Sequence, residues 1–239
     1  MAPETVKLIW SDEANLLVRL SNWRDVIVLS TYGNILCSSN NDEGYTFIGE
    51  EFDSNGVFIH IEKLGWNSRR IRSKIAINAC LDTIWNVLTD YEKLTDFIPG
   101  LAVSKLLDKK HNFARLYQVG QQSLPLGLKF TAKAVLDCFE KEVAIFTSGK
   151  RRDIEFKMTE GDFQFFDGKW SIEQVTKSRS EEFDDSVGKE FETSLSYFVD
   201  VKPKLWLPVH LVEGRLCKEI QTNLCCIRQE AQKIIFHTQ

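Results

Sequence analysis

The sequence predicts an α+β fold in which a curved antiparallel sheet wraps around one long C-terminal helix. Two observations predict it. Several segments after residue 100 alternate apolar and polar residues with a period of two, whereas residues 207–236 keep apolar residues on one helical stripe. An antiparallel sheet with one apolar face must cover that face, and the C-terminal helix is the one element long enough to do so.

The first part of this domain reads as short strands followed by two short helices. Strand-like runs occupy 57–63 and 71–77, and we expect the two short helices to follow the first strand. Residues 79–89 carry apolar side chains at helical spacing, namely Leu81, Ile84, Trp85 and Leu88. A second short helical turn over 91–97 stops before Pro99-Gly100, a pair that breaks helices.

The middle of the chain reads as consecutive antiparallel strands. The expected strands cover 113–121, 128–138, 143–147, 154–158, 163–166, 169–175 and 191–201. Between the fifth and sixth of these, Asp167-Gly168 is typical of a two-residue hairpin turn. Residues 176–189 are polar and charged and read as a surface loop.

The last element is a helix from about Leu207 to Phe236, with Pro208 near its start, where a missing N–H costs little. Its expected apolar stripe consists of Val209, Val212, Leu216, Ile220, Ile227, Ala231 and Ile234. Such a helix leaves space against a strongly curved sheet, and ligand pockets are commonly built in spaces of this kind.

Composition and charge exclude several classes of protein. The 239 residues are 43% hydrophobic and 27% charged, which excludes a wholly disordered or low-complexity chain. The formal net charge of −4 lacks the basic footprint of a nucleic-acid-binding protein, so we expect no nucleic-acid partner. No apolar run reaches the roughly 18 residues of a membrane-spanning helix, so no integral membrane segment is expected.

Residues 1–54 are the least informative, and we treat them as an N-terminal extension of undetermined structure before one domain over 55–239. Acidic residues at positions 4, 12 and 13 make the N-terminus unlike a secretory signal or an acid-poor transit peptide. The six cysteines show no C-x-x-C pair and no metal-type spacing with the histidines, so we expect reduced thiols and no metal. Residues 120–127 lack the lysine and glycine spacing of a phosphate-binding loop, and no cofactor is predicted.

Three stretches resemble a known family. The run from Trp85 to Gly100, WNVLTDYEKLTDFIPG, is similar to a stretch of START-like (SRPBCC) proteins, and in particular of the polyketide cyclase/dehydrase and coenzyme Q-binding START group. Residues 161–172 and 203–208 are further matches, closest to its plant, plastid-type branch, and the resemblance covers about 55–237. It implies a helix-grip fold with a deep hydrophobic cavity for lipids, quinones or polyketides. It also implies a plastid location, although the chain shows no transit peptide; otherwise we expect a cytoplasmic protein.

The apolar faces carry more aromatic side chains than one sheet–helix interface obviously needs. On their own they are typical of a filled core, and the resemblance favours a cavity for some of them. The residues expected to line the cavity or its mouth are Trp85, Phe97, Leu124, Leu126, Phe130, Phe156, Phe165, Trp170, Tyr197, Leu216 and Ile220. Leu124 and Leu126 lie in an apolar loop that covers a cavity mouth, dips into a membrane surface or packs on residues 1–54.

Residues for catalysis are poorly represented, and we assign no catalytic residue. The histidines at 60, 111, 210 and 237 are scattered, and no nucleophile motif occurs. Asp90, Glu92 and Asp96 read as solvated charges on short helical turns. Arg115 is the one charged candidate for the apolar side of a strand, although alternation there does not determine its face.

We therefore expect a protein that binds, shields or transfers a hydrophobic small molecule such as a prenylquinone or another lipid, without catalysis. The alternative is a polyketide cyclase, aromatase or dehydratase that uses the same cavity. A third reading is an interaction module that recruits a protein through residues 1–54 or the acidic loop at 181–185. Basic residues at 69–74 and 150–152 are candidates for peripheral contact with anionic membranes, or else are ordinary solvated strand edges.

Overall fold

The structure, a computed structural model, describes residues 52–123, 129–176, 191–204 and 209–238. Nine antiparallel strands form one sheet in the order β1-β2-β9-β8-β7-β5-β4-β3, with β6 paired to β7. The strands are β1 (Val57–Gly65), β2 (Ser68–Ile77), β3 (Leu101–Lys110), β4 (Phe113–Ser123), β5 (Lys129–Glu140), β6 (Ala144–Phe146), β7 (Gly149–Gly161), β8 (Phe163–Thr176) and β9 (Phe191–Pro203). The expected antiparallel sheet is confirmed.

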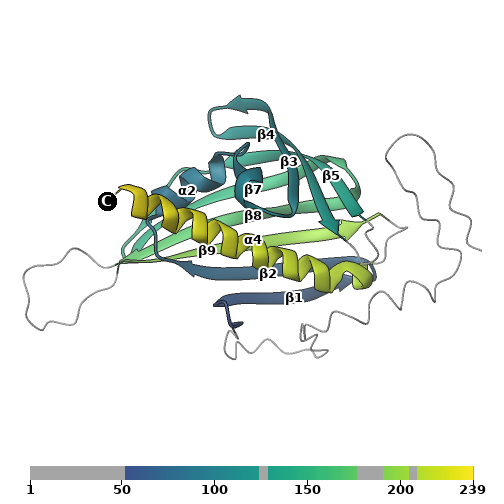
Figure 1. Cartoon of the computed structure of the whole chain (residues 1–239), viewed down its shortest axis with the longest axis horizontal. Helices are drawn as coiled ribbons and strands as arrows, with labels where there is room; N and C mark the ends of the chain where they lie inside the picture. The colour runs from purple at the N-terminus through teal and green to yellow at the C-terminus, as the bar shows by residue number, and fades with distance from the viewer. Residues whose placement is uncertain (1–51, 124–128, 177–190, 205–208, 239) are drawn as a thin grey trace, which may run out of the picture. The chain divides into compact units, whose positions relative to one another are not determined.

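Three helices lie among the described residues: α2 (Leu81–Thr89), α3 (Leu94–Phe97) and α4 (Val209–Thr238). The α+β class and the long C-terminal helix are therefore confirmed. One detail differs, because α2 and α3 follow the second strand and not the first. The pairing of β2 with β9 places the first strands beside the last one, and α4 crosses this part of the sheet (Figure 1).

The long helix α4 is held on the sheet by a stripe of buried residues at spacings of three and four. The stripe consists of Cys217, Ile220, Leu224, Ile227 and Ala231. Ile220, Ile227 and Ala231 were expected there, Cys217 and Leu224 were not, and Ile234 is 41% exposed. The predicted positions 209 and 212 have side chains outside the described residues. On one flank of the stripe, Gln221 donates to Asp53 and Arg228 donates to the carbonyl of Asn55.

The predicted hairpin turn at Asp167-Gly168 is wrong, because β8 runs through it without interruption. Gly168 pairs with Phe156 of β7 and with Val199 of β9. A Cβ on Gly168 would lie 2.1 Å from the carbonyl oxygen of Phe198 and 2.7 Å from Cζ of Phe156. The glycine therefore allows neighbouring groups to approach the strand closely, and it does not form a turn.

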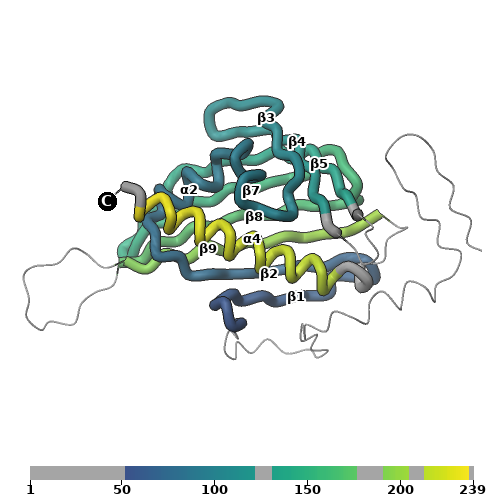
Figure 2. Tube along the Cα trace, viewed as in Figure 1, coloured from purple at the N-terminus to yellow at the C-terminus, as the bar shows by residue number. Residues whose placement is uncertain are grey.

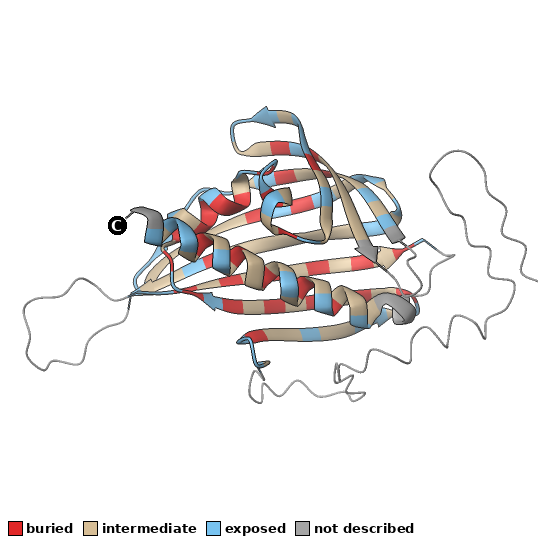
Figure 3. Cartoon of the chain, viewed as in Figure 1, coloured by how far each residue is buried: buried red, intermediate tan, exposed pale blue. Residues whose placement is uncertain are grey.

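The sheet curves along its width, and its two sides are covered differently. In Figure 2 the trace of β3 and β4 bends away from the part of the sheet formed by β1, β2 and β9. Among the described elements, α4 packs mainly on β2, with smaller contacts to β1 and β9, while α2 packs on α4, β8 and β7. Figure 3 shows buried and less buried residues alternating along the strands. The concave face is thus covered by helices over only part of its width.

We expect Gly168→Ala to lower the free energy of unfolding by about 1–3 kcal/mol, because the added methyl group overpacks the strand. The matched control is Gly214→Ala in α4, where a Cβ meets no atom within 4 Å. That change should stabilise the protein by about 0.5–1 kcal/mol, since alanine favours the helix. Urea unfolding of both variants measures the difference. Wild-type stability in Gly168→Ala would contradict the close approach described here.

Candidate ligand-binding surface on the concave face

Five aromatic rings form a continuous row on the concave face of the sheet. Successive ring centroids are 5.3 Å apart for Phe163 and Phe166, 5.5 Å for Phe166 and Phe156, 5.8 Å for Phe156 and Tyr197, and 4.2 Å for Tyr197 and Trp170. The rings come from β7, β8 and β9, so the row crosses three neighbouring strands. We refer to these five residues as the aromatic row.

The strand register explains why these rings meet. Trp170 lies directly opposite Tyr197, and the ring of Phe156 lies against Gly168, whose missing side chain leaves room for it. An irregularity between Phe163 and Phe165 in the pairing of β8 with β9 shifts the alternation by one residue. Phe166 therefore joins Phe163 in the row.

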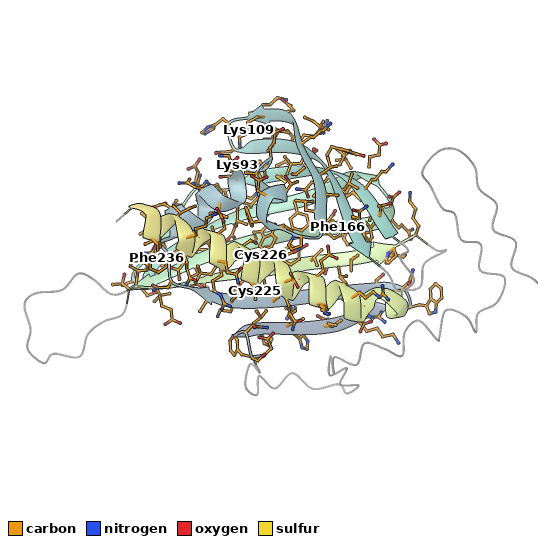
Figure 4. All side chains as sticks on the ribbon, viewed as in Figure 1. Lys93, Lys109, Phe166, Cys225, Cys226 and Phe236 are labelled. Carbon is orange, nitrogen blue, oxygen red and sulfur yellow. The ribbon has the colours of Figure 1, made fainter. Side chains whose placement is uncertain are left out.

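This shift corrects the expectation for Phe165. Strict alternation placed Phe165 on the same face as Phe163, but Phe165 is 38% exposed and Phe166 takes the inward position. A bulge of this kind has no clear signature in one sequence, because both positions are phenylalanine. Figure 4 labels Phe166 on the half of the domain where α4 begins, and Phe236 at the opposite end of α4.

Packing of the concave face changes from one end of the strands to the other. Toward α2 the inward residues are almost fully buried, as Ile154, Ile172 and Leu195 show. Toward the start of α4 they are only partly buried, although they pack against the same core; these residues include Ala134, Met158, Phe163, Phe166 and Leu216. The accessible half of the concave face therefore contains one end of the aromatic row.

Two polar groups face this surface. Burial holds the pKa of the Tyr197 hydroxyl well above its usual range, and the carboxylate of Glu219 on α4 adds to that rise. Among the described residues, no hydrogen-bond partner is found for the Tyr197 hydroxyl. A Cβ on Gly100 would lie 2.6 Å from Oε1 of Glu219, so the turn between α3 and β3 touches α4 here. The phenol is protonated at neutral pH and can donate to an acceptor.

The other predicted site residues have different outcomes. Trp85 is buried in α2 with the guanidinium of Arg152 3.4 Å from its ring centroid, which places it in the packed half. Phe97 and Leu216 are partly buried against the core, and Ile220 belongs to the buried stripe of α4. Leu124, Leu126 and the side chain of Phe130 lie outside the described residues. Contact of any of these residues with a ligand stays a prediction.

Several inward residues were not predicted as site residues. Phe163, Phe166 and Met158 pack in the accessible half, the charge of Glu219 acts on the Tyr197 hydroxyl, and Gly168 makes room for the row. The alternating pattern did reveal Met158 and Phe163 as inward residues. The sequence pattern did not identify Glu219, because many neighbouring residues on α4 are also polar and a glutamate among them looks solvent-exposed.

The charged catalytic candidate points away from the concave face. Ala114 and Leu116 are buried on the inner side of β4, so Arg115 between them is exposed on the outer side. Its guanidinium donates to both carboxylate oxygens of Asp137, at 2.6 and 2.8 Å, and this pairing lowers the pKa of that carboxyl. A role for Arg115 in chemistry on the concave face is thus excluded by its orientation.

The two basic segments are mostly paired within the fold. Carboxylate partners are present for Arg69 (Glu213), Arg70 (Asp200), Arg72 (Glu62), Lys150 (Asp82) and Arg151 (Asp153). Because their charges are neutralised within the fold, these residues are poor candidates for docking on an anionic membrane. Within the described ranges, no cluster of three potential metal ligands is present, and no helix is long and apolar enough to cross a bilayer.

One polar cluster joins the turn between α2 and α3 to strands β3 and β5. The Tyr91 hydroxyl donates to Oε1 of Glu140 at 2.8 Å, and the Lys109 ammonium donates to the same oxygen. Burial raises the pKa of Tyr91 above its usual range and that of the adjacent Cys138 thiol to about 12. Lys93 and Lys109 are labelled in this region in Figure 4. None of these residues belongs to the aromatic row, so the cluster is separate from the candidate site.

A pocket among the described residues lies away from the aromatic row. It has a volume of about 290 Å³ and lies at the β6–β7 hairpin. Its lining residues are Ile145, Phe146, Thr147, Gly149, Lys150, Gln174 and Thr176. None of them belongs to the aromatic row, so this pocket is separate from the candidate site.

The two raised tyrosine pKa values predict a loss of stability at high pH. In the unfolded chain Tyr91 and Tyr197 ionise near pH 10, whereas in the folded chain they stay neutral to higher pH. The unfolded state therefore binds fewer protons above pH 10, and the free energy of unfolding falls as pH rises further. Urea unfolding at a series of pH values should show this slope, and Tyr197→Phe should make it shallower. An unchanged slope in that variant would contradict the burial of the hydroxyl.

Comparison with known proteins agrees with this architecture. A model of the polyketide cyclase / dehydrase and lipid transport family matches residues 77–228, from the end of β2 into α4. No curated protein matches the sequence.

Among solved structures, the fold is similar to the STAR-related lipid transfer protein (fragment 25–204) from Xanthomonas axonopodis. The TM-score is 0.58 at 14% identity, over 76% of this chain and 97% of that one. The human StarD13 lipid transfer and protein localization domain has a TM-score of 0.53 at 13% identity, over 74% of this chain and 85% of that one. At this identity the likeness shows the START helix-grip fold alone. Because the family model covers more than half of the residues, this chain belongs to the polyketide cyclase / dehydrase and lipid transport family.

Proposed function

We propose that the chain binds a hydrophobic small molecule, such as a prenylquinone or another lipid, on the aromatic row of the concave face. The observation that carries the proposal is the row itself: five contacting rings whose outer end lies in the accessible half of the concave face. Burial of apolar ligand area supplies about 25 cal/mol per Å², without any particular polar partner. Flat rings also offer stacking surfaces for a planar head group.

The polar groups beside the row suit a ligand with one oxygen acceptor. The Tyr197 hydroxyl stays protonated at neutral pH, so it can donate to a quinone or ester carbonyl. The carboxylate of Glu219 lies on the helix above and disfavours an anionic group at the same place. A neutral lipid with a carbonyl near one end therefore fits the surface better than a free fatty acid.

The alternative is a polyketide cyclase, aromatase or dehydratase acting on the same surface. Family membership is compatible with both functions, since the family description includes cyclases and lipid transport. The sequence candidate for catalysis, Arg115, faces away, and Tyr197 and Glu219 are the polar groups that remain near the row. Binding without turnover is the proposal that these groups favour. A plastid location also stays a proposal, and it rests on the resemblance of three sequence stretches.

The direct test is extraction of the purified protein with organic solvent, followed by mass spectrometry, and titration with a short-chain ubiquinone analogue. Ala134→Phe on the inner face of β5 should weaken binding of the analogue at least about tenfold, because it fills the accessible half. Lys133→Phe is the matched control, since Lys133 is exposed on the same strand, and it should bind like the wild type. Equal binding by both variants, or no extracted molecule and no binding of quinone or phospholipid probes, would refute the proposal.

The enzyme alternative makes a separate prediction for Tyr197→Phe. If the chain only binds its ligand, this variant should lose at most roughly tenfold in affinity, the value of one hydrogen bond. Incubation of wild type with the extracted ligand or the ubiquinone analogue should leave that compound chemically unchanged, as followed by mass spectrometry. A product formed by wild type and absent with Tyr197→Phe would favour the enzyme.

A further inference from the structure

The turn between β1 and β2 exposes large apolar side chains that contribute little to the fold. Trp66 and Asn67 form this two-residue turn, and Trp66 is 72% exposed. Leu64, two residues earlier, is 44% exposed at the point where the pairing of β1 and β2 is irregular. Tight turns are usually made of glycine, asparagine, aspartate, proline and serine. An exposed tryptophan and leucine at such a turn are therefore candidates for contact with another molecule or surface.

The turn is braced from beneath, so its exposed side chains are held in place. Arg69 is only 7% exposed and donates through Nε to Oε2 of Glu213 on α4 at 2.6 Å. Its Nη1 also donates to the carbonyls of Gly65 (3.2 Å) and Ser68 (2.9 Å), on the two sides of the turn. A rigid presentation of this kind lowers the entropy cost of binding a surface.

Two lysines next to the turn supply positive charge. Lys63 and Lys204 are exposed, and neither has a carboxylate partner among the described residues. Lys204 belongs to this region because Asn67 donates to the carbonyl of the preceding residue, Pro203, at 3.4 Å. The whole chain has a formal charge of −4, so any attraction to an anionic surface must come from a local patch.

A second apolar turn provides an internal comparison. The β6–β7 hairpin exposes Ile145 (82%), but its basic neighbours are neutralised. Lys141 pairs with Glu155, Lys150 with Asp82 and Arg151 with Asp153. Of these two hairpins, the one at the β1–β2 turn has exposed apolar side chains, Leu64 and Trp66, beside lysines without a carboxylate partner among the described residues. Tryptophan at a lipid interface beside lysine is the pattern of a peripheral anchor.

We propose that the β1–β2 turn, through Leu64 and Trp66 with Lys63 and Lys204, docks the protein on the surface of an anionic lipid membrane. Pro203, which Asn67 contacts, is paired with Phe163 at the outer end of the aromatic row. Docking therefore brings the accessible half of the concave face toward the bilayer. Figure 1 shows the β1–β2 turn, the end of β9 and the start of α4 at the same end of the domain. The docking itself rests on the turn alone and not on the proposed ligand.

The test is co-sedimentation of the full chain with vesicles of phosphatidylcholine and phosphatidylserine, and with vesicles of phosphatidylcholine alone. Wild type should bind the anionic vesicles more tightly, and added salt should weaken that binding. Leu64→Ser with Trp66→Ser should weaken it at least about tenfold. Lys63→Gln with Lys204→Gln should weaken it by roughly fivefold for each lysine. Ile145→Ser, in strand β6 of the other exposed hairpin, is the matched control and should bind like the wild type.

Three outcomes would overturn the docking proposal. They are no binding of wild type to anionic vesicles, wild-type binding by the Leu64/Trp66 double variant, or an equal loss with Ile145→Ser. Thermal melting should show that all variants keep wild-type stability, because each changed side chain is exposed. Titration with the ubiquinone analogue in detergent separates the two proposals. If the double variant binds the analogue but not vesicles, both stand, whereas vesicle binding by a protein that never binds a ligand refutes only the proposed function.

Discussion

The helix α4 is narrower than the sheet on which it packs, and this mismatch in width leaves part of the concave face without a covering helix. A helix with its side chains is about 10–12 Å across, and strands are spaced about 4.8 Å apart, so one helix covers two or three strands. The buried stripe of α4 packs on β2 and its neighbours β1 and β9, and α2 covers one end of β7 and β8. A nine-stranded sheet is wider than this cover, and its remaining apolar face must pack on itself or on something else. The aromatic row occupies that remaining face.

On the part of the concave face that no helix covers, large aromatic rings pack against one another. Phe156 leans over Gly168, Tyr197 lies opposite Trp170, and the irregularity in β8 turns Phe166 inward. Each device increases the apolar ring area on the concave face, and the polar groups that the row adds are the Tyr197 hydroxyl and the Trp170 indole N–H. The surface is therefore suited to hold an apolar ligand through contact area, and the absence of Arg115 from it leaves little for acid–base chemistry. The turn at Trp66 lies at the same end of the strands as Phe163, so the proposed docking would place the proposed ligand surface next to the bilayer.

The sequence was sufficient to predict the larger elements, because each leaves a periodic pattern that its own residues carry. Leu81, Ile84, Trp85 and Leu88 identified α2, and Thr193, Leu195, Tyr197, Val199 and Val201 identified the inner face of β9. Prediction from the sequence failed where pairing with a neighbouring strand determines the local conformation or the direction of a side chain. Asp167-Gly168 has the local chemistry of a turn, but pairing on both sides keeps it extended. Phe165 and Phe166 cannot be separated by alternation, since a bulge in the pairing with β9 determines which one faces inward. Arg115 is ambiguous for the same reason, because its neighbours Ala114 and Leu116 are apolar and only the sheet shows their side.

We propose the aromatic row as the surface that holds a hydrophobic ligand, and this proposal can be tested by locating the bound ligand. It is tested most directly by photo-crosslinking the full chain to a quinone probe that carries a diazirine, with the attachment sites mapped by mass spectrometry. If the row holds the ligand, attachment should fall on β7, β8 and β9 at or beside Phe156, Phe166 and Tyr197, and unlabelled quinone should compete with the probe. Attachment concentrated at the separate pocket around Ile145 and Phe146, or spread over the outer face of the sheet, would contradict it.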